Sequence, residues 1–136
     1  MRIGYAISTI MTTDIAVVEA KAPVAEAIRV MVERNIGSVV VTREGSMVGI
    51  VTERDILRKL FLGEEYTTLK VEDAMSSPLF TIESDASIGE AADLMSERNV
   101  RRLLVNEKEK IRGIITERDL MRATLDVFGK LSYAWI

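Results

Sequence analysis

The residues best suited to chemistry are two carboxylates in a tetrapeptide, Thr-Glu-Arg-Asp, that occurs twice. Asp55 follows Thr52 by three residues, and Asp119 follows Thr116 with the same spacing. At a helix start this spacing is typical of a capping device, in which the threonine accepts from a backbone N–H and the aspartate lies in the first turn. A single T-x-x-D segment would most often be only such a cap. Because both copies keep TERD while nearby surface residues diverge, the sequence favours an additional role in ligand binding.

The chain contains no histidine and no cysteine. This excludes Ser-His-Asp and Cys-His catalysis, the usual zinc sites and the commonest general base at neutral pH. Asp55 and Asp119 also lack an evident nucleophile or a second clustered carboxylate with metal-ligand spacing, and arginine cannot act as a general base. We therefore expect no catalytic residue, no catalytic cofactor and no metal site, and we expect that the protein is not an enzyme.

The composition is that of an ordinary folded protein, with 136 residues of which 48% are hydrophobic and 29% charged. This length predicts one compact module. The formal charge is −3, and the basic residues are interspersed with acidic ones. Because nucleic-acid binding usually needs a cluster of basic residues, the sequence argues against it. The first residues lack the pattern of a secretion signal, and no apolar run approaches the roughly 20 residues of a membrane span. We expect a cytoplasmic protein that does not act at a membrane.

The sequence contains an internal duplication. A shift of 64 residues aligns 11–58 with 75–122 without a gap, and 17 of these 48 positions are identical. Two repeats are too few for a solenoid, so we expect them to face each other as a closed pair related by a pseudo-twofold axis. Within a single module of residues 1–136 we place repeat one at about 8–62, a polar linker at about 63–70, repeat two at about 71–126 and a C-terminal tail at 127–136.

Both repeats show the same order of segments: a short strand, a helix, two strands and a second helix. This βαββα order predicts the fold class α+β. Ser87 and Glu90 form a capping-box pattern before the first helix of repeat two, and both first helices end at an asparagine, Asn35 or Asn99. A helical turn is expected at 71–75, mirroring 8–11. We expect strands at 16–19, 38–42 and 47–51 in repeat one and at 79–83, 102–105 and 111–115 in repeat two.

Apolar residues at helical spacing define the faces that we expect to pack on the sheets. The first helix of repeat one begins near Pro23, which suits a first helical turn, and the second helices begin at Thr52 and Thr116. The expected packing residues are Val24, Ala27, Ile28, Met31 and Val32 on the first helix of repeat one, Ile56, Leu57, Leu60 and Phe61 on its second helix, and Leu120, Met121 and Leu125 on the second helix of repeat two.

The segments GIVTERD (49–55) and GIITERD (113–119) resemble the G-h-h-T-x-x-D signature that ends each repeat of the cystathionine β-synthase (CBS) domain family. The match covers nearly the whole chain. The resemblance implies a CBS pair, or Bateman module, that binds adenosine nucleotides such as AMP, ADP or ATP as regulatory ligands in two clefts between the repeats. It also implies that the module regulates a partner protein and forms a homodimer through its helices.

The resemblance further assigns the ligand-binding residues. Each aspartate would accept hydrogen bonds from both hydroxyls of a ribose, because a carboxylate offers two acceptor oxygens, and Thr52 or Thr116 would offer a hydroxyl near the ribose or phosphate. Each cleft would combine the T-x-x-D of one repeat with the first strand and the start of the second strand of the other. Asp55 would act with Leu79, Phe80, Val100, Arg101 and Arg102, and Asp119 with Thr13, Ile15, Ala16, Ile36 and Ser38.

The two repeats differ after the shared asparagine, where repeat one reads NIGSVVV and repeat two reads NVRRLLV. A guanidinium group suits phosphate, so we expect Arg101 or Arg102 to bind phosphate and the Asp55 cleft to hold a charged nucleotide more tightly. The alternative is that both arginines are exposed strand-end residues, paired with Glu107 or Glu109.

Other functions remain as alternatives. The breadth of the family allows S-adenosylmethionine or nucleic acid as the ligand, and a nucleotide-processing enzyme is the least favoured of the alternatives. Steep loss of RNA or DNA affinity with salt would indicate nucleic-acid binding. We expect the regulated effector to be a separate, unidentified protein, because the repeats and linkers account for nearly all residues of the chain.

Overall fold

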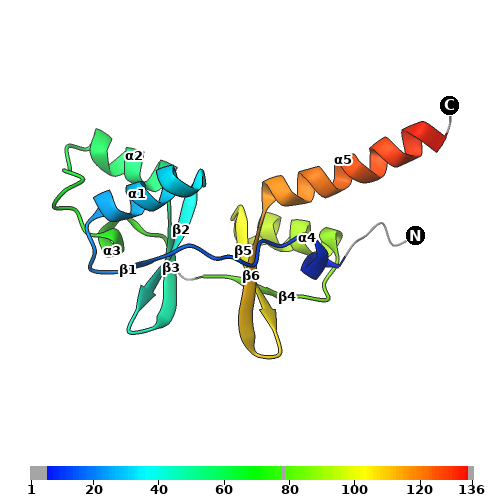
Figure 1. The fold of residues 1–136 in the computed structure, drawn as a ribbon, viewed down its shortest axis with the longest axis horizontal. Helices are drawn as coiled ribbons and strands as arrows, with labels where there is room; N and C mark the ends of the chain where they lie inside the picture. The colour runs from blue at the N-terminus through cyan, green and yellow to red at the C-terminus, as the bar shows by residue number, and fades with distance from the viewer. Residues whose placement is uncertain (1–5, 78, 135–136) are drawn as a thin grey trace. The chain divides into compact units, whose positions relative to one another are not determined.

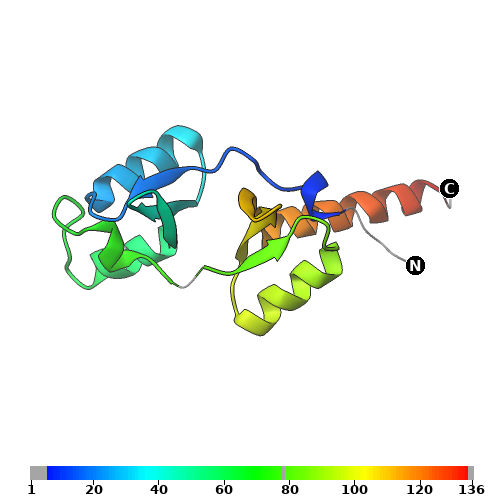
Figure 2. The same cartoon turned by 90° about the horizontal axis from the view of Figure 1, so that it is seen from below.

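The computed structural model describes residues 6–77 and 79–134. The chain forms two compact units, each with its own hydrophobic core (Figures 1 and 2). One unit consists of residues 15–79, and the other combines the residues up to 14 with those from 80 onward. Each contains a three-stranded sheet and helices, which confirms the predicted α+β class and the order of elements in the two repeats.

The unit of residues 15–79, named the β1–β3 unit after its strands, follows the predicted βαββα order. Its elements are β1 (Val17–Glu19), α1 (Val24–Arg34), β2 (Ser38–Arg43), β3 (Ser46–Thr52), α2 (Glu53–Phe61) and α3 (Val71–Ala74). The middle strand β2 is parallel to β1 and antiparallel to β3. α1 contacts β2, and α2 contacts β3, so each helix packs against a strand that is its neighbour in the sequence.

The second unit, named the β4–β6 unit, has the same topology. Its elements are the 3-10 helix η1 (Ile7–Thr9), β4 (Thr81–Glu83), α4 (Ile88–Arg98), β5 (Arg102–Glu107), β6 (Lys110–Thr116) and α5 (Glu117–Ala134). Strand β5 lies between β4, to which it is parallel, and β6, to which it is antiparallel. α4 contacts β5, and α5 contacts both α4 and β6.

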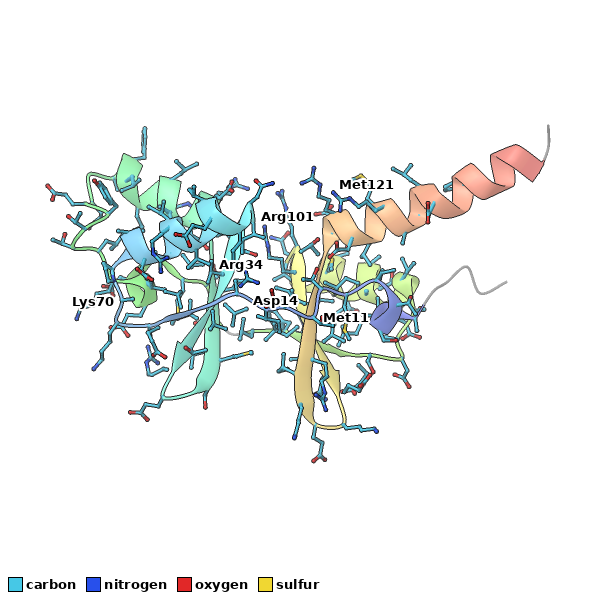
Figure 3. All side chains as sticks on the ribbon, viewed as in Figure 1. Met11, Asp14, Arg34, Lys70, Arg101 and Met121 are labelled. Atoms are coloured by element: carbon cyan, nitrogen blue, oxygen red, sulfur yellow. The ribbon has the colours of Figure 1, made fainter. Side chains whose placement is uncertain are left out.

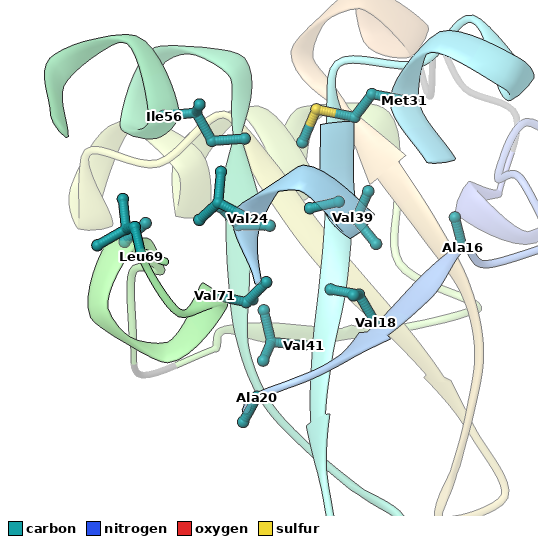
Figure 4. Packing of buried hydrophobic residues seen from close by; sticks show 13 residues of the cluster. Ala16, Val18, Ala20, Val24, Met31, Val39, Val41, Ile56, Leu69 and Val71 are labelled. Atoms are coloured by element: carbon teal, nitrogen blue, oxygen red, sulfur yellow. The ribbon is translucent and has the colours of Figure 1, made fainter. Parts of the chain in front are cut away.

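The core of the β1–β3 unit lies between one face of its sheet and the helices (Figure 4). Val39 and Val41 are two residues apart on β2, so both point to the same face. They pack in one cluster with Val24 and Met31 of α1, which are seven residues apart and therefore share a helix face. Full burial of each such side chain contributes about 1.5–3 kcal/mol. The corresponding residues of the β4–β6 core are Ile88, Met95, Leu103 and Val105.

The short helices are exchanged between the sequence repeats. α3 directly precedes the first strand of repeat two, yet its Val71 and Ala74 belong to the core of the β1–β3 unit. η1 precedes the first strand of repeat one, yet Ile7 belongs to the core of the β4–β6 unit. Both helical turns predicted from the sequence are present. Each compact unit is therefore completed by the segment that leads into the other repeat.

In the β1–β3 unit, the segment after α3 pairs with the edge strand β3 beside a glycine. Ser76 forms a bridge with Ile50 through two backbone hydrogen bonds, with N–O distances of 2.8 and 3.0 Å. A Cβ atom placed on Gly49 would lie 2.6 Å from the sulfur of Met75 and 2.8 Å from the carbonyl oxygen of Ser76. Because real Cβ contacts do not approach so closely, the glycine of the first signature is required by packing.

The β4–β6 unit repeats this arrangement. Thr12 forms a bridge with Ile114, with N–O distances of 3.0 and 2.9 Å. A Cβ atom on Gly113 would lie 2.7 Å from the sulfur of Met11 and 2.8 Å from the carbonyl oxygen of Thr12. The first letter of each G-h-h-T-x-x-D signature thus provides the space in which a Met-Ser or Met-Thr segment docks.

The local signals at the helix ends are mostly confirmed. Asn35 and Asn99 adopt the left-handed conformation, with φ of 52° and 53°, and end α1 and α4 as predicted. The Ser87 hydroxyl accepts from the Glu90 N–H at 3.1 Å, whereas the reciprocal bond of a full capping box is not among the described contacts. Pro23 is the N-cap of α1 and not its first helical residue, because its ψ of 151° is extended.

The predicted packing faces of the helices are wrong in part. Along the second helices, Ile56 and Leu120 are buried as predicted, but the residue that follows each of them is exposed. Neighbouring positions on a helix point in directions that differ by about 100°, so two adjacent apolar residues cannot both face the sheet. The residues predicted to pack that are exposed are Val32 (75%), Leu57 (65%), Phe61 (91%), Met121 (58%) and Leu125 (62%).

The C-terminal segment predicted as a tail is largely helical, because α5 extends to Ala134. The tryptophan of this segment, Trp135, lies outside the described residues. Across residues 6–77 and 79–134, no helix has both the length and the apolar character that are needed to span a bilayer.

Candidate functional site

Both T-x-x-D segments form reciprocal helix caps. At the start of α2, the Thr52 hydroxyl accepts from the Asp55 N–H at 3.1 Å, and Asp55 Oδ2 accepts from the Thr52 N–H at 3.0 Å. At the start of α5 the matching distances between Thr116 and Asp119 are 3.2 and 2.9 Å, and the Thr116 hydroxyl also donates to Asp119 Oδ2 at 3.0 Å. The capping role considered for these residues is therefore real in both units.

These caps use one oxygen of each carboxylate. Among the described residues, Oδ1 of Asp55 and Oδ1 of Asp119 form no hydrogen bond with the protein. Both aspartates are half-buried. A carboxylate whose orientation is fixed through Oδ2 and whose Oδ1 is unused can still accept a hydrogen bond from a ligand hydroxyl. Capping and ligand binding are thus compatible in the same side chain.

The first backbone N–H of each second helix donates a hydrogen bond to the residue before the middle strand. Glu53 N–H donates to the Gly37 carbonyl at 3.1 Å, and Glu117 N–H donates to the Arg101 carbonyl at 2.9 Å. In register, Ser38 pairs with Thr52 and Arg102 pairs with Thr116. The start of the middle strand is therefore held beside the T-x-x-D helix in each unit.

The residue directly before the first strand of each unit lies at the same end of its sheet. The Ala16 carbonyl accepts from the Val40 N–H at 2.9 Å, and the Phe80 carbonyl accepts from the Leu104 N–H at 3.0 Å. Each unit therefore gathers part of the predicted site residues at one end of its own sheet. In the β1–β3 unit these are Ala16, Ser38, Thr52 and Asp55, and in the β4–β6 unit they are Phe80, Arg101, Arg102, Thr116 and Asp119.

The remaining predicted residues are placed less directly at these sheet ends. Ile36 and Val100 are half-buried and pack against the cores of their own units, so they also have a structural role. Thr13 is exposed, whereas Ile15 and Leu79 are half-buried. The predicted sharing of one ligand between the T-x-x-D of one repeat and the strand residues of the other stays a prediction.

Arg101 lies beside the start of α5 (Figure 3). Its Nε is 3.8 Å from Oε2 of Glu117, and the two side chains are 71% and 63% exposed. The alternative that Arg101 is an exposed residue at the strand end is confirmed, but its ion-pair partner is Glu117 and not Glu107 or Glu109, because the backbone bond of the helix start places Glu117 beside it. Arg102 is half-buried.

Two residues near this site were not predicted. Arg98, at the end of α4, places its guanidinium carbon 5.3 Å from the centroid of the Phe80 ring, a cation–π distance. Glu117 forms the ion pair with Arg101. The available signal was that repeat two carries Phe80 and Arg101 where repeat one carries Ala16 and Gly37. Among the described residues, no acidic cluster is suited to hold a metal ion.

Comparisons with known proteins agree with the repeat and the fold. A family model described as "CBS domain" matches residues 7–62 and 71–126. An uncharacterized 17.7 kDa protein of Acidianus ambivalens is 36% identical over 130 residues, which cover 91% of this chain and 78% of that protein. The crystal structure of an uncharacterized conserved protein from Pyrococcus horikoshii has a TM-score of 0.79 at 33% identity, covering 91% of this chain and 95% of that one.

A further structure matches in fold at lower identity. It is the CBS domain pair of protein MJ0100 in complex with 5′-methylthioadenosine and S-adenosyl-L-methionine, with a TM-score of 0.76 and 23% identity. The match covers 87% of this chain and 98% of that one. The likeness therefore extends over both units of the structure described above.

Proposed function

This chain belongs to the CBS domain family as a tandem CBS pair, and from that premise we propose that it is a cytoplasmic regulatory module that binds an adenosine nucleotide. The observation that carries the proposal is the pair of duplicated carboxylates, Asp55 and Asp119. Each is held at a helix start through Oδ2 and has an Oδ1 that forms no hydrogen bond with the described part of the chain. This arrangement fits the hydroxyls of a ribose, which need a fixed acceptor.

The ligands of protein MJ0100, 5′-methylthioadenosine and S-adenosyl-L-methionine, support the adenosine part of the proposal. Both contain an adenosyl group, and both lack phosphate. They therefore favour S-adenosylmethionine as a second candidate ligand for this chain. Arg101 and Arg102 favour the phosphorylated nucleotides AMP, ADP and ATP, because a guanidinium group forms paired hydrogen bonds with phosphate oxygens.

Ligand titration tests the proposal. Isothermal calorimetry with AMP, ADP, ATP and S-adenosylmethionine is expected to show sub-millimolar binding of at least one of them. A module that only binds is also expected to leave ATP intact, as measured by the release of ADP, AMP or phosphate. Absence of binding by all four ligands, or ATP turnover that Asp55→Ala abolishes, would contradict the proposal.

We further propose that two molecules of the chain associate through exposed helix faces. Leu57 and Phe61 on α2 are exposed, and the residues 64 positions later, Met121 and Leu125 on α5, are exposed as well. Both repeats therefore leave the same two helix positions apolar and uncovered. A second molecule presents the same pair of faces, so a closed symmetric dimer can cover them.

The double replacement of Phe61 and Leu125 by serine is expected to weaken self-association at least about tenfold, because large apolar residues dominate interface energies. Sedimentation velocity over a range of protein concentrations measures this change. Val17→Ser is the matched control, because Val17 is 48% exposed but lies on β1. A wild-type chain that remains monomeric at high concentration would rule out the proposed dimer.

A further inference from the structure

We infer that Glu117 competes with the phosphate of the bound nucleotide for Arg101, and that this competition lowers the affinity for phosphorylated ligands but not for uncharged adenosine. The inference rests on the proposed function, because it concerns the charged part of the same ligand. It is carried by the Arg101–Glu117 ion pair and by the different residue that repeat one has at the position of Arg101.

The backbone fixes Arg101 and Glu117 as neighbours. The Glu117 N–H donates to the Arg101 carbonyl at 2.9 Å, so the two residues remain adjacent whatever their side chains do. Oε2 of Glu117 lies 3.8 Å from Nε of Arg101, and the side chains are 63% and 71% exposed. A ligand phosphate can therefore reach the guanidinium group and replace the carboxylate.

The geometry of the pair favours replacement by phosphate. Charge-assisted N–H···O bonds are about 2.7–2.9 Å long, so the 3.8 Å separation of Arg101 and Glu117 is an ion pair without a hydrogen bond. Exposed ion pairs of this kind are weak. A phosphate that forms two parallel hydrogen bonds with Arg101 gains more than Glu117 loses, whereas an uncharged ligand gains nothing from displacing it.

Repeat one provides a matched control within the same chain. The Glu53 N–H donates to the Gly37 carbonyl at 3.1 Å, which is the same backbone contact. Glu53 is exposed like Glu117, but the residue at the position of Arg101 is a glycine. The two glutamates therefore share their place at a helix start and differ in whether a guanidinium group lies beside them.

The test is calorimetry of AMP and ATP binding, with adenosine as the uncharged comparison, to the full chain, to three single variants and to the double variant that combines Arg101→Ala with Glu117→Gln. Glu117→Gln is expected to raise the affinity for AMP and ATP about two- to fivefold, the range of a weak exposed ion pair, and to leave that for adenosine unchanged. Glu53→Gln is expected to change none of the three. Arg101→Ala is expected to weaken AMP and ATP binding and to cancel the effect of Glu117→Gln.

The outcomes separate this inference from the proposed function. If the wild-type chain binds AMP or ATP, and Glu117→Gln and Glu53→Gln change that affinity equally, the inference is overturned and the proposed function stays intact. The same holds if the gain from Glu117→Gln persists when Arg101 is alanine. Absence of binding of all three ligands to the wild-type chain would overturn the proposed function, and the inference with it.

Discussion

Replacement of both Asp55 and Asp119 by alanine is expected to remove measurable binding of AMP and ATP. Each single replacement is expected to weaken binding at its own site about 10- to 100-fold, as follows from roughly 1.5–3 kcal/mol for hydrogen bonds to a charged group. The reason is that the ribose hydroxyls lose the free Oδ1 acceptor that the helix cap holds in place. Calorimetry on the two single variants and the double variant measures the effect.

The aspartates also stabilise their helices, so the experiment needs a variant that loses only a cap. Ser87→Ala provides it, because the Ser87 hydroxyl accepts from the Glu90 N–H at 3.1 Å at the start of α4. Loss of such a cap costs about 1 kcal/mol of unfolding free energy. We expect Ser87→Ala to lower stability as Asp55→Ala does while nucleotide affinity stays unchanged. Equal affinity in both variants would mean that Asp55 only caps its helix.

Asparagine at position 55 separates the two roles within one side chain. Its amide oxygen can still accept from the Thr52 N–H, as Asp55 Oδ2 does at 3.0 Å, so α2 keeps its cap. The other atom of the amide is a donor and carries no negative charge, so the free acceptor is lost. We therefore expect Asp55→Asn to unfold nearly as the wild-type chain does but to bind nucleotide weakly.

The parts of the fold that could be predicted from the sequence are those that depend on local periodicity. Short apolar segments indicated the strands, and Asn35 and Asn99 marked the ends of the first helices because they tolerate a left-handed conformation. The T-x-x-D cap was also predictable, since its threonine and aspartate contact each other within one helical turn. In each case the interacting groups lie within a few residues of one another.

The features that were missed depend on contacts between distant segments. The exchange of η1 and α3 between the repeats requires a chain path that no local pattern encodes. The pairing of Arg101 with Glu117 was missed because the hairpin of β5 and β6 separates them in sequence and a backbone hydrogen bond rejoins them. Leu57 and Phe61 look like core residues by type, and only the orientation of α2 shows that they are exposed.

The replacement of Gly49 or Gly113 by alanine is expected to lower the free energy of unfolding by about 2–4 kcal/mol, combining overpacking with weakened backbone hydrogen bonds. The new Cβ would lie 2.6 or 2.7 Å from a methionine sulfur and 2.8 Å from a backbone carbonyl oxygen. A methionine side chain can move aside, but the carbonyl belongs to a bridge with bonds of 2.8 to 3.0 Å and cannot. Urea unfolding followed by circular dichroism measures the loss.

Gly89→Ala is the control that distinguishes this packing effect from a general effect of replacing glycine. Gly89 lies in α4, and the nearest atom to its Cβ position is the Ser87 hydroxyl at 3.8 Å, an ordinary contact. Alanine there is expected to stabilise the chain by about 0.5–1 kcal/mol, because glycine is unfavourable within helices. If Gly113→Ala were as harmless as Gly89→Ala, the segment of Met11 and Thr12 would not be docked on β6. The glycine of the signature would then need an explanation other than the exchange of segments between the repeats.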